Sequence, residues 1–155
     1  MSEISDAIQA KCLALGDRVI KLNDYLLSQA AVEHENYKKE LRQRKSGQKT
    51  SSIFHQPSSI PLHLQSVAVL CNQLLRAGTS IGANNAEACN AISKADFKSK
   101  SFIALKEARE SLYWIDLLHR NSYLDEKQYQ SIYYDAEELV KILVTRCKKL
   151  NEVEV

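Results

Sequence analysis

The sequence predicts an all-α protein: an antiparallel up-down-up-down four-helix bundle with an extended first helix and a long first connection. Three observations lead to this fold class. Apolar or small residues recur at three- and four-residue steps in four successive segments, the pattern of a helix face packed in a bundle. No segment alternates convincingly with a period of two, so no strands are expected. The 155 residues include only four glycines and two prolines, few for a β protein with many turns.

The first helix is predicted over about residues 3–45. Its apolar stripe is regular from Ile8 to Leu26, and then it thins as charged residues take over. Gly47 is the first expected terminator. Residues 46–61 hold both prolines together with Ser, Gly and Thr, a composition typical of a loop.

The second helix is predicted over about residues 62–92, with a stripe that continues to Ile92. Gly78 and Gly82 lie one turn apart inside this stripe. Each glycine costs a helix roughly 1 kcal/mol against alanine. We therefore expect a neighbouring helix backbone to approach closely at these two positions, so that a larger residue would disrupt the bundle.

Capping boxes mark the start of the last two helices. Ser93 with Asp96 opens the third helix, and Asp125 with Gln128 opens the fourth. A chain of this length can bury roughly two-thirds of its unfolded surface as one domain. We expect a single domain over residues 1–155, with helices at about 3–45, 62–92, 94–121 and 126–150.

Composition excludes several classes of protein. The polar, acidic start does not resemble a signal peptide, and no run of about 18 apolar residues could span a membrane. A net charge of +2 implies no particular partner. Three of the four cysteines (Cys12, Cys71 and Cys147) fall on apolar stripes, and no C-x-x-C pair occurs. Buried free thiols in a reducing cytoplasm are the expected outcome.

The chemistry of an enzyme is not apparent in the sequence. Gly78-Thr-Ser80-Ile-Gly82 matches the G-x-S-x-G nucleophile elbow of hydrolases, but that elbow needs a strand before the serine, and here a helical stripe runs through it. No Glu-x-x-His pair, as a di-iron bundle would need, is present, and the four histidines are scattered. We expect a non-enzymatic protein with no catalytic residues, no metal and no cofactor.

A family resemblance rests on Gln73-Leu-Leu-Arg-Ala-Gly-Thr-Ser-Ile-Gly-Ala-Asn, Glu87-Ala88, Ser93-Lys-Ala-Asp-Phe, Ile103-Ala-Leu-Lys-Glu-Ala-Arg-Glu and Tyr113-Trp114. These runs are similar to the four-helix-bundle family encoded in 23S ribosomal RNA intervening sequences. The similarity is strong over roughly residues 64 to 124 and holds by pattern only in the outer helices. It implies a homo-oligomeric ring of five bundles without established catalytic activity. The family's first connection is usually short, whereas about thirty residues near 33–61 look inserted here.

Several motif residues are polar or charged and lie near the inner faces of the helices. We interpret them mainly as packing residues or as ion pairs between helices or subunits. The alternative for Arg76 or Lys106 is a contact with a ligand or a nucleic acid. The motif residues singled out in this way are Arg76, Gly78, Ser80, Gly82, Asn84, Glu87, Asp96, Lys106, Glu107, Glu110 and Trp114.

A basic segment at the end of the first helix is the candidate nucleic-acid contact, since clustered cations neutralise phosphates and release counterions. It contains six cations and one acid, Glu40, and the alternative is a solvated helix end. A more distant similarity, to the accessory protein of diversity-generating retroelements, implies association with a reverse transcriptase and with RNA or DNA. The six cations are Lys38, Lys39, Arg42, Arg44, Lys45 and Lys49.

Self-association is expected because several helices carry apolar residues outside their core stripes, a patch that a monomer would rarely expose. Two functions remain open: a ring that binds nucleic acid, or an adaptor oligomer that binds another protein and no nucleic acid. The off-stripe residues are Ile20, Leu27, Phe102, Trp114, Ile142 and Val144.

Overall fold

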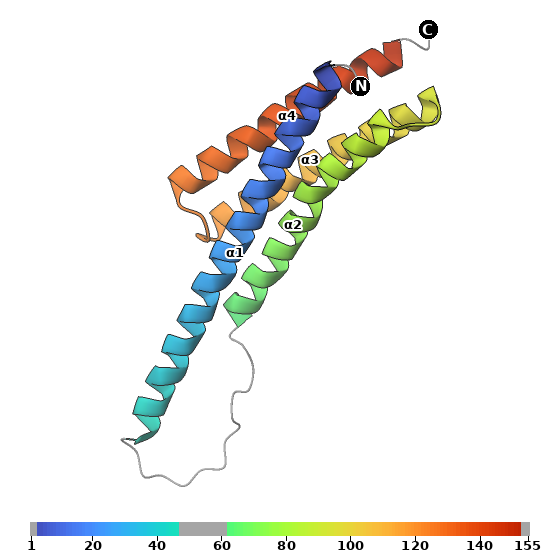
Figure 1. Cartoon of the computed structure of the whole chain (residues 1–155). Helices are drawn as coiled ribbons and strands as arrows, with labels where there is room; N and C mark the ends of the chain where they lie inside the picture. Colours follow the sequence, from blue (N-terminus) through green and yellow to red (C-terminus); the bar gives the residue numbers. More distant parts are fainter. Residues whose placement is uncertain (1–2, 47–61, 153–155) are drawn as a thin grey trace.

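The protein is a bundle of four antiparallel helices, seen in a computed structural model that describes residues 3–46 and 62–152. Figure 1 shows each helix running opposite to the one before it, which confirms the predicted up-down-up-down topology. The described residues contain no strand. The helices are α1 (Glu3–Ser46), α2 (Leu62–Cys89), α3 (Lys94–Arg120) and α4 (Glu126–Glu152).

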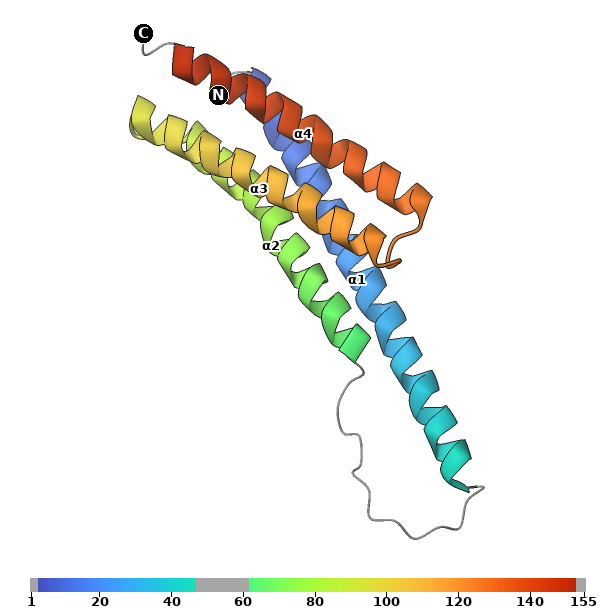
Figure 2. The same cartoon turned by 180° about the vertical axis from the view of Figure 1, so that it is seen from behind.

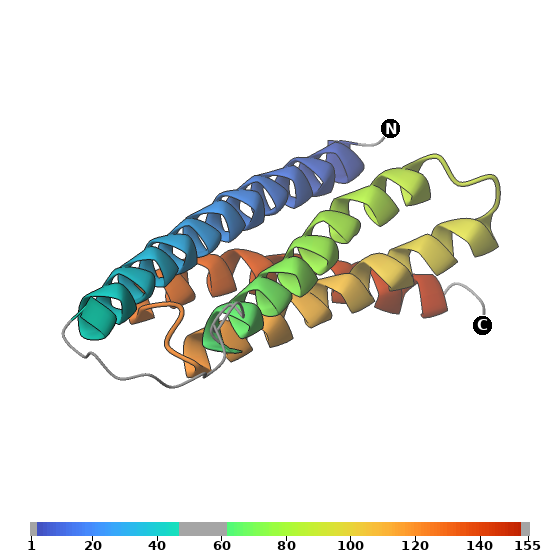
Figure 3. The same ribbon diagram turned by 90° about the horizontal axis from the view of Figure 1, so that it is seen from below.

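The helices pack in a cycle in which α1 and α3 occupy opposite corners. α1 contacts α2 and α4, and α3 contacts the same two helices, as the view from below shows (Figure 3). Leucine, isoleucine and valine side chains from all four helices fill the centre, and burying each one contributes about 1.5–3 kcal/mol. The largest fully buried side chains of this core include Leu15, Val19, Leu74, Ile81, Ile115, Leu118, Leu139 and Leu143.

The two glycines of α2 lie where α1 approaches. A Cβ atom added at Gly78 would lie 3.0 Å from Cγ2 of Val19 on α1. One added at Gly82 would lie 3.4 Å from Cβ of Cys12, which is an ordinary contact. α1 therefore packs closely at Gly78, but through the Val19 side chain and not through its backbone, and at Gly82 the nearest backbone atom of α1, the carbonyl carbon of Cys12, lies 4.0 Å from the added Cβ.

The end of α2 differs from the prediction. The helix ends at Cys89 instead of Ile92, and the Ile92 side chain is 95% exposed. After Cys89, the Asn90 and Ala91 amides donate to carbonyls only three residues back, those of Glu87 and Ala88. This tightens and ends the last turn. The Ile92 amide then donates to Oδ2 of Asp96 in the first turn of α3, so Ile92 belongs to the connection before α3 and not to α2.

The predicted capping box of α4 is complete, and that of α3 is formed on the Ser93 side, since the Asp96 carboxylate accepts from the Ile92 amide and not from the Ser93 amide. The Asp96 amide donates to Oγ of Ser93, which is the N-cap of α3. Before α4, the Asp125 amide donates to Oε1 of Gln128, and the Gln128 amide donates to Oδ1 of Asp125. These bonds satisfy amide groups that the first turn of a helix leaves unpaired.

α1 is much longer than its neighbours. It has 44 residues against 28 in α2 and 27 in each of α3 and α4. Figures 1 and 2 show its C-terminal part projecting beyond the start of α2 and beyond the α3–α4 turn. The predicted extension of the first helix is confirmed. The predicted loop 46–61, with Gly47, falls almost wholly outside the described residues.

All four cysteines are free thiols, three of them buried as predicted. Burial raises the pKa of Cys12 and of Cys71 to about 11. Thiols at such pKa values stay protonated near neutrality, and they act as small apolar core residues.

Candidate nucleic-acid interface

The C-terminal part of α1 loses its packing gradually after Leu26. That side chain is 5% exposed, and from Leu27 to Gln43, the last described side chain of the helix, none is buried. Ala30 still packs against the core, and Glu33 lines a pocket with Val67 and Tyr123. Tertiary packing therefore contributes less to this part of α1 than to the part before it. Local interactions help to hold it, such as the ion pair between Lys38 Nζ and Glu35 Oε1 at 3.1 Å. We call residues 27–46 the projection.

The predicted cations are distributed unevenly on the projection. Lys39 and Arg42 are exposed and lie three residues apart, on neighbouring turns of one face. Lys38 is half-buried, and its hydrogen bond to Glu35 lowers the pKa of that carboxyl. Arg44 and Lys45 belong to the same helix, whereas Lys49 lies outside the described residues.

The charge of the projection is modest. Three carboxylates, Glu33, Glu35 and Glu40, accompany its five cations. Tyr37 is 46% exposed beside the cations, so one aromatic ring could stack on a base. One such segment supplies only a few phosphate contacts, and useful affinity would need several copies acting together.

A second basic surface lies at the other end of the bundle. It surrounds a groove of about 260 Å³ between α3 and α4. Lys106, Arg109 and Lys148 line this groove, are exposed, and share its wall with no carboxylate. Sequence reasoning named Lys106 as a possible ligand or nucleic-acid contact, but it did not join Lys106 to Lys148, because these cations come from two helices about forty residues apart. The available signal was that Lys106 and Arg109 lie outside the apolar stripe of α3 and Lys148 lies outside that of α4.

The glycine-rich motif is an uninterrupted part of α2. Ser80 lies in mid-helix, and its carbonyl accepts a hydrogen bond from Nδ2 of Asn84 at 2.9 Å. No strand precedes this serine among the described residues, so the strained turn of a nucleophile elbow is not formed there.

The remaining motif residues make contacts within α3 and between α2 and α3. Glu87 forms an ion pair with Lys100 across the two helices. Glu110 accepts a hydrogen bond from Nε1 of Trp114 at 3.0 Å. Partial burial raises the pKa of Glu107, and the nearby Glu110 raises it further. Arg76 and Lys106 are exposed.

A buried polar cluster joins three helices. Asn85 is fully buried on the apolar stripe of α2. Its Nδ2 donates to Gln9 Oε1 of α1 at 2.6 Å, and its Oδ1 accepts from Arg146 Nη1 of α4 at 2.7 Å. The Arg146 guanidinium also lies 5.7 Å from the ring centre of Phe97 on α3. Sequence reasoning missed the cluster, although a polar residue in an apolar stripe was a signal.

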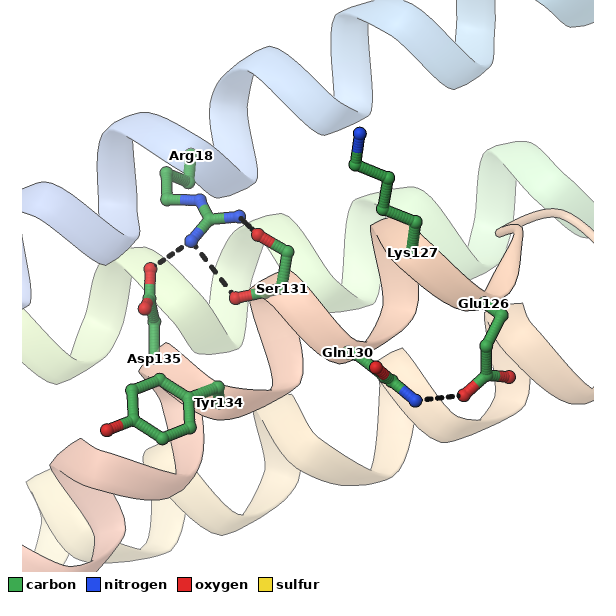
Figure 4. Close-up of a pocket in the computed structure, with 7 residues that line it drawn as sticks. All are labelled: Arg18, Glu126, Lys127, Gln130, Ser131, Tyr134 and Asp135. Carbon is green, nitrogen blue, oxygen red and sulfur yellow. Dashed lines mark hydrogen bonds and ion pairs between the residues drawn. The ribbon is translucent and has the colours of Figure 1, made fainter.

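A wide groove lies between α1 and α4, and Figure 4 shows the side chains that line it. Its volume is about 710 Å³. Arg18 spans it, donating to the Ser131 carbonyl at 3.1 Å and to Ser131 Oγ at 2.8 Å, and it also pairs with Asp135. Since these groups satisfy one another, they act as a clamp between the two helices.

Residues 3–46 and 62–152 contain no group of three or more His, Cys, Asp or Glu side chains placed to hold a metal ion. None of the described helices is long and apolar enough to cross a membrane.

Comparison with known proteins identifies relatives. The family model described as 23S rRNA-intervening sequence protein matches residues 38–145. Among solved structures, the chain is similar to a protein of unknown function from the S23 ribosomal protein family of Bacteroides thetaiotaomicron VPI-5482. The two share 32% identity and a TM-score of 0.68, over 94% of this chain and 98% of the other. No curated protein matches.

Proposed function

Because this chain belongs to the 23S rRNA-intervening sequence protein family, we propose that it is a non-enzymatic homo-oligomer that associates with nucleic acid, chiefly RNA, in the cytoplasm. We propose a ring of five subunits, the number that the family resemblance implies. The observation that carries the proposal is the projection, which holds Lys39 and Arg42 in solvent, away from the rest of the bundle.

The geometry of the projection suits phosphate contacts. Exposed cations on one face of a helix can contact neighbouring phosphates of a nucleic-acid backbone. Each neutralised phosphate releases counterions, so affinity falls steeply as salt rises. In a ring, the projections of all subunits would present their cations together, and several weak contacts would add as avidity.

The non-enzymatic part of the proposal is supported by how the candidate chemical groups are used. Ser80, the serine of the hydrolase-like motif, lies inside a continuous helix. In the groove between α1 and α4, Arg18 is engaged by Ser131 and Asp135. These groups maintain structure, and none is arranged as a nucleophile with a base.

An adaptor oligomer without a nucleic-acid role is the second candidate. It is favoured by large apolar side chains on the outer surface of α1, among them Leu13 at 60% and Ile20 at 44% exposure. A protein partner such as a reverse transcriptase would bury such residues. Apolar burial is not weakened by moderate salt, so salt dependence separates the two candidates.

The test is a salt titration of RNA binding, with duplex DNA measured in parallel. Glutamine at Lys38, Lys39, Arg42, Arg44 and Lys45 should flatten the slope of log affinity against log salt and leave the melting temperature nearly unchanged. A control with glutamine at Lys21 and Lys127, two exposed lysines on the body of the bundle, should keep the parent slope. If the parent binds no RNA at about 50 mM salt, the nucleic-acid proposal fails and the adaptor candidate replaces it.

A further inference from the structure

α1 carries a second heptad pattern, on its solvent side. Leu13, Ile20 and Leu27 lie seven residues apart and are 60%, 44% and 38% exposed. Asp17 and Asp24 alternate with them, also in solvent. The full alternation runs in steps of three and four through exposed residues 10, 13, 17, 20, 24, 27 and 31, and we call it the α1 seam.

The α1 seam points away from its own bundle. At about 100° per residue, its aspartates lie nearly opposite the buried stripe that includes Leu15 and Val19, and its apolar residues lie roughly 100–140° from that stripe. Apolar residues at heptad spacing are the knobs that pack into a neighbouring helical surface. Within the described part of the chain, neither Asp17 nor Asp24 forms an ion pair.

The groove between α3 and α4 has the complementary character. Phe102, Leu105 and Val144 form its apolar wall, and Lys106 and Arg109 lie on its rim together with Lys148. No carboxylate lines it, and none of these three cations is in an ion pair with a described residue. One surface thus combines apolar side chains with anions, and the other combines apolar side chains with cations.

We propose that the α1 seam of one copy docks on the α3–α4 groove of a second copy. Leu13 and Ile20 would cover the apolar wall, and Asp17 and Asp24 would lie beside the cations. Since α1 and α3 occupy opposite corners, the two surfaces belong to different sides of one bundle. The contact is therefore heterologous, and repeated copies form a ring when the rotation between neighbours closes and an open filament when it does not. The inference rests on the self-association part of the proposed function and identifies its surfaces.

The charges favour docking of the α1 seam on the groove over contact between the α1 seams of two copies. A seam-to-seam contact would bring the aspartates of two copies together, which is unfavourable. Trp114, an earlier candidate for the interface, is half-buried and packs against its own core, so its loss would report on folding as well. Reversal of exposed charges tests the contact without removing any core side chain.

The test uses two reversal variants and measures mass by light scattering. Asp17→Lys with Asp24→Lys makes the seam cationic, and Lys106→Glu with Arg109→Glu makes the groove anionic. Each variant alone should shift the particle from an assembly toward the 17.6 kDa monomer. A chain carrying all four changes should reassemble, because its seam and groove are complementary again. Mixing the two reversal variants should also restore larger particles in which the two variants alternate, although a closed ring of five would hold one mismatched contact.

Controls separate this inference from folding and from nucleic-acid binding. Lys127→Glu with Gln130→Glu, on the exposed start of α4, should leave the particle size unchanged. All variants should melt within a few degrees of the parent. A monomeric parent at micromolar concentration would overturn both the inference and the proposed self-association, whereas the salt titration tests RNA binding separately.

Two further results would overturn the docking surfaces alone. The first is an oligomeric parent whose size survives both reversals. The second is a folded four-change chain that stays monomeric. If the groove reversal abolishes RNA binding and leaves the size unchanged, the groove is a nucleic-acid contact and not a subunit interface.

Discussion

α1 is held to its two neighbours in opposite ways. On the α2 side, contact depends on the absence of side chains, since Gly78 and Gly82 let Val19 and Cys12 approach the α2 backbone. On the α4 side, long polar side chains span a wider gap. Arg18 bonds Ser131 and Asp135, and Lys11 pairs with Glu138 at 2.8 Å.

The difference shows where the bundle is sensitive to change. Close packing has no spare volume, so added atoms must displace a neighbour. The polar contacts between α1 and α4 border the 710 Å³ groove, so water can reach Arg18, Ser131 or Asp135 when one of their partners is removed. Stability around α1 should therefore depend strongly on the α2 side and weakly on the α4 side.

The largest expected effect is that of Gly78→Leu. An alanine Cβ at this position would already lie 3.0 Å from a methyl of the fully buried Val19, and leucine adds three more carbons. We expect a loss of about 3 kcal/mol in the free energy of unfolding, measured by urea denaturation. The control Gly82→Ala should be neutral or slightly stabilising, since its Cβ makes an ordinary contact at 3.4 Å and helix propensity improves. Equal stabilities of Gly78→Leu and the parent would refute the close-packing account.

Much of this fold could be read from the sequence because both main signals are local. Three-four periodicity marks the buried face of each helix, and capping boxes such as Ser93 with Asp96 fix where helices begin. The end of α2 could not be placed, because Ile92 continues the apolar period of α2. In the structure, however, its amide donates to Asp96 in the first turn of α3. The apolar period alone does not show which of the two helices the Ile92 backbone joins.

The candidate sites were less predictable. The basic segment of α1 was visible because its cations are contiguous in sequence. The groove between α3 and α4 and the Asn85–Arg146 contact depend on which side chains meet across helices, and no local pattern encodes that meeting. The α1 seam lies between these cases: its heptad is regular, but only the position of the core shows that it faces solvent.

Alkaline pH provides the next test of the apolar side. Burial raises the pKa of Cys12 and Cys71 to about 11 from an ordinary value near 9. A raised pKa means that folding favours the protonated thiol, so its contribution is complete below about pH 9 and is lost as pH rises through 11. At about 1.4 kcal/mol per pKa unit, the loss is on the order of 1–3 kcal/mol per thiol.

Urea midpoints measured across this alkaline range should fall faster for the parent than for Cys12→Ala with Cys71→Ala. The variant starts from a lower stability, because alanine leaves small cavities, so the readout is the slope with pH. Parallel slopes for the two proteins would show that these thiols are accessible to solvent and that α1 and α2 pack less closely than their contacts indicate.

The smallest expected effect is that of Arg18→Ala, on the polar side. The pair is about one-third exposed, with side-chain exposures of 39% for Arg18 and 35% for Asp135. Ion pairs at such exposure contribute about 0–1 kcal/mol, and the hydrogen bonds to Ser131 add a similar amount at most. We expect a loss of about 1 kcal/mol by urea denaturation, because Asp135 and Ser131 can turn to water in the groove. A cycle with Asp135→Ala isolates the pair, and the double variant should be about as stable as Arg18→Ala, because Arg18→Ala already removes the ion pair. A loss as large as that from Gly78→Leu would show that the clamp, and not the glycine contact, holds α1 in place.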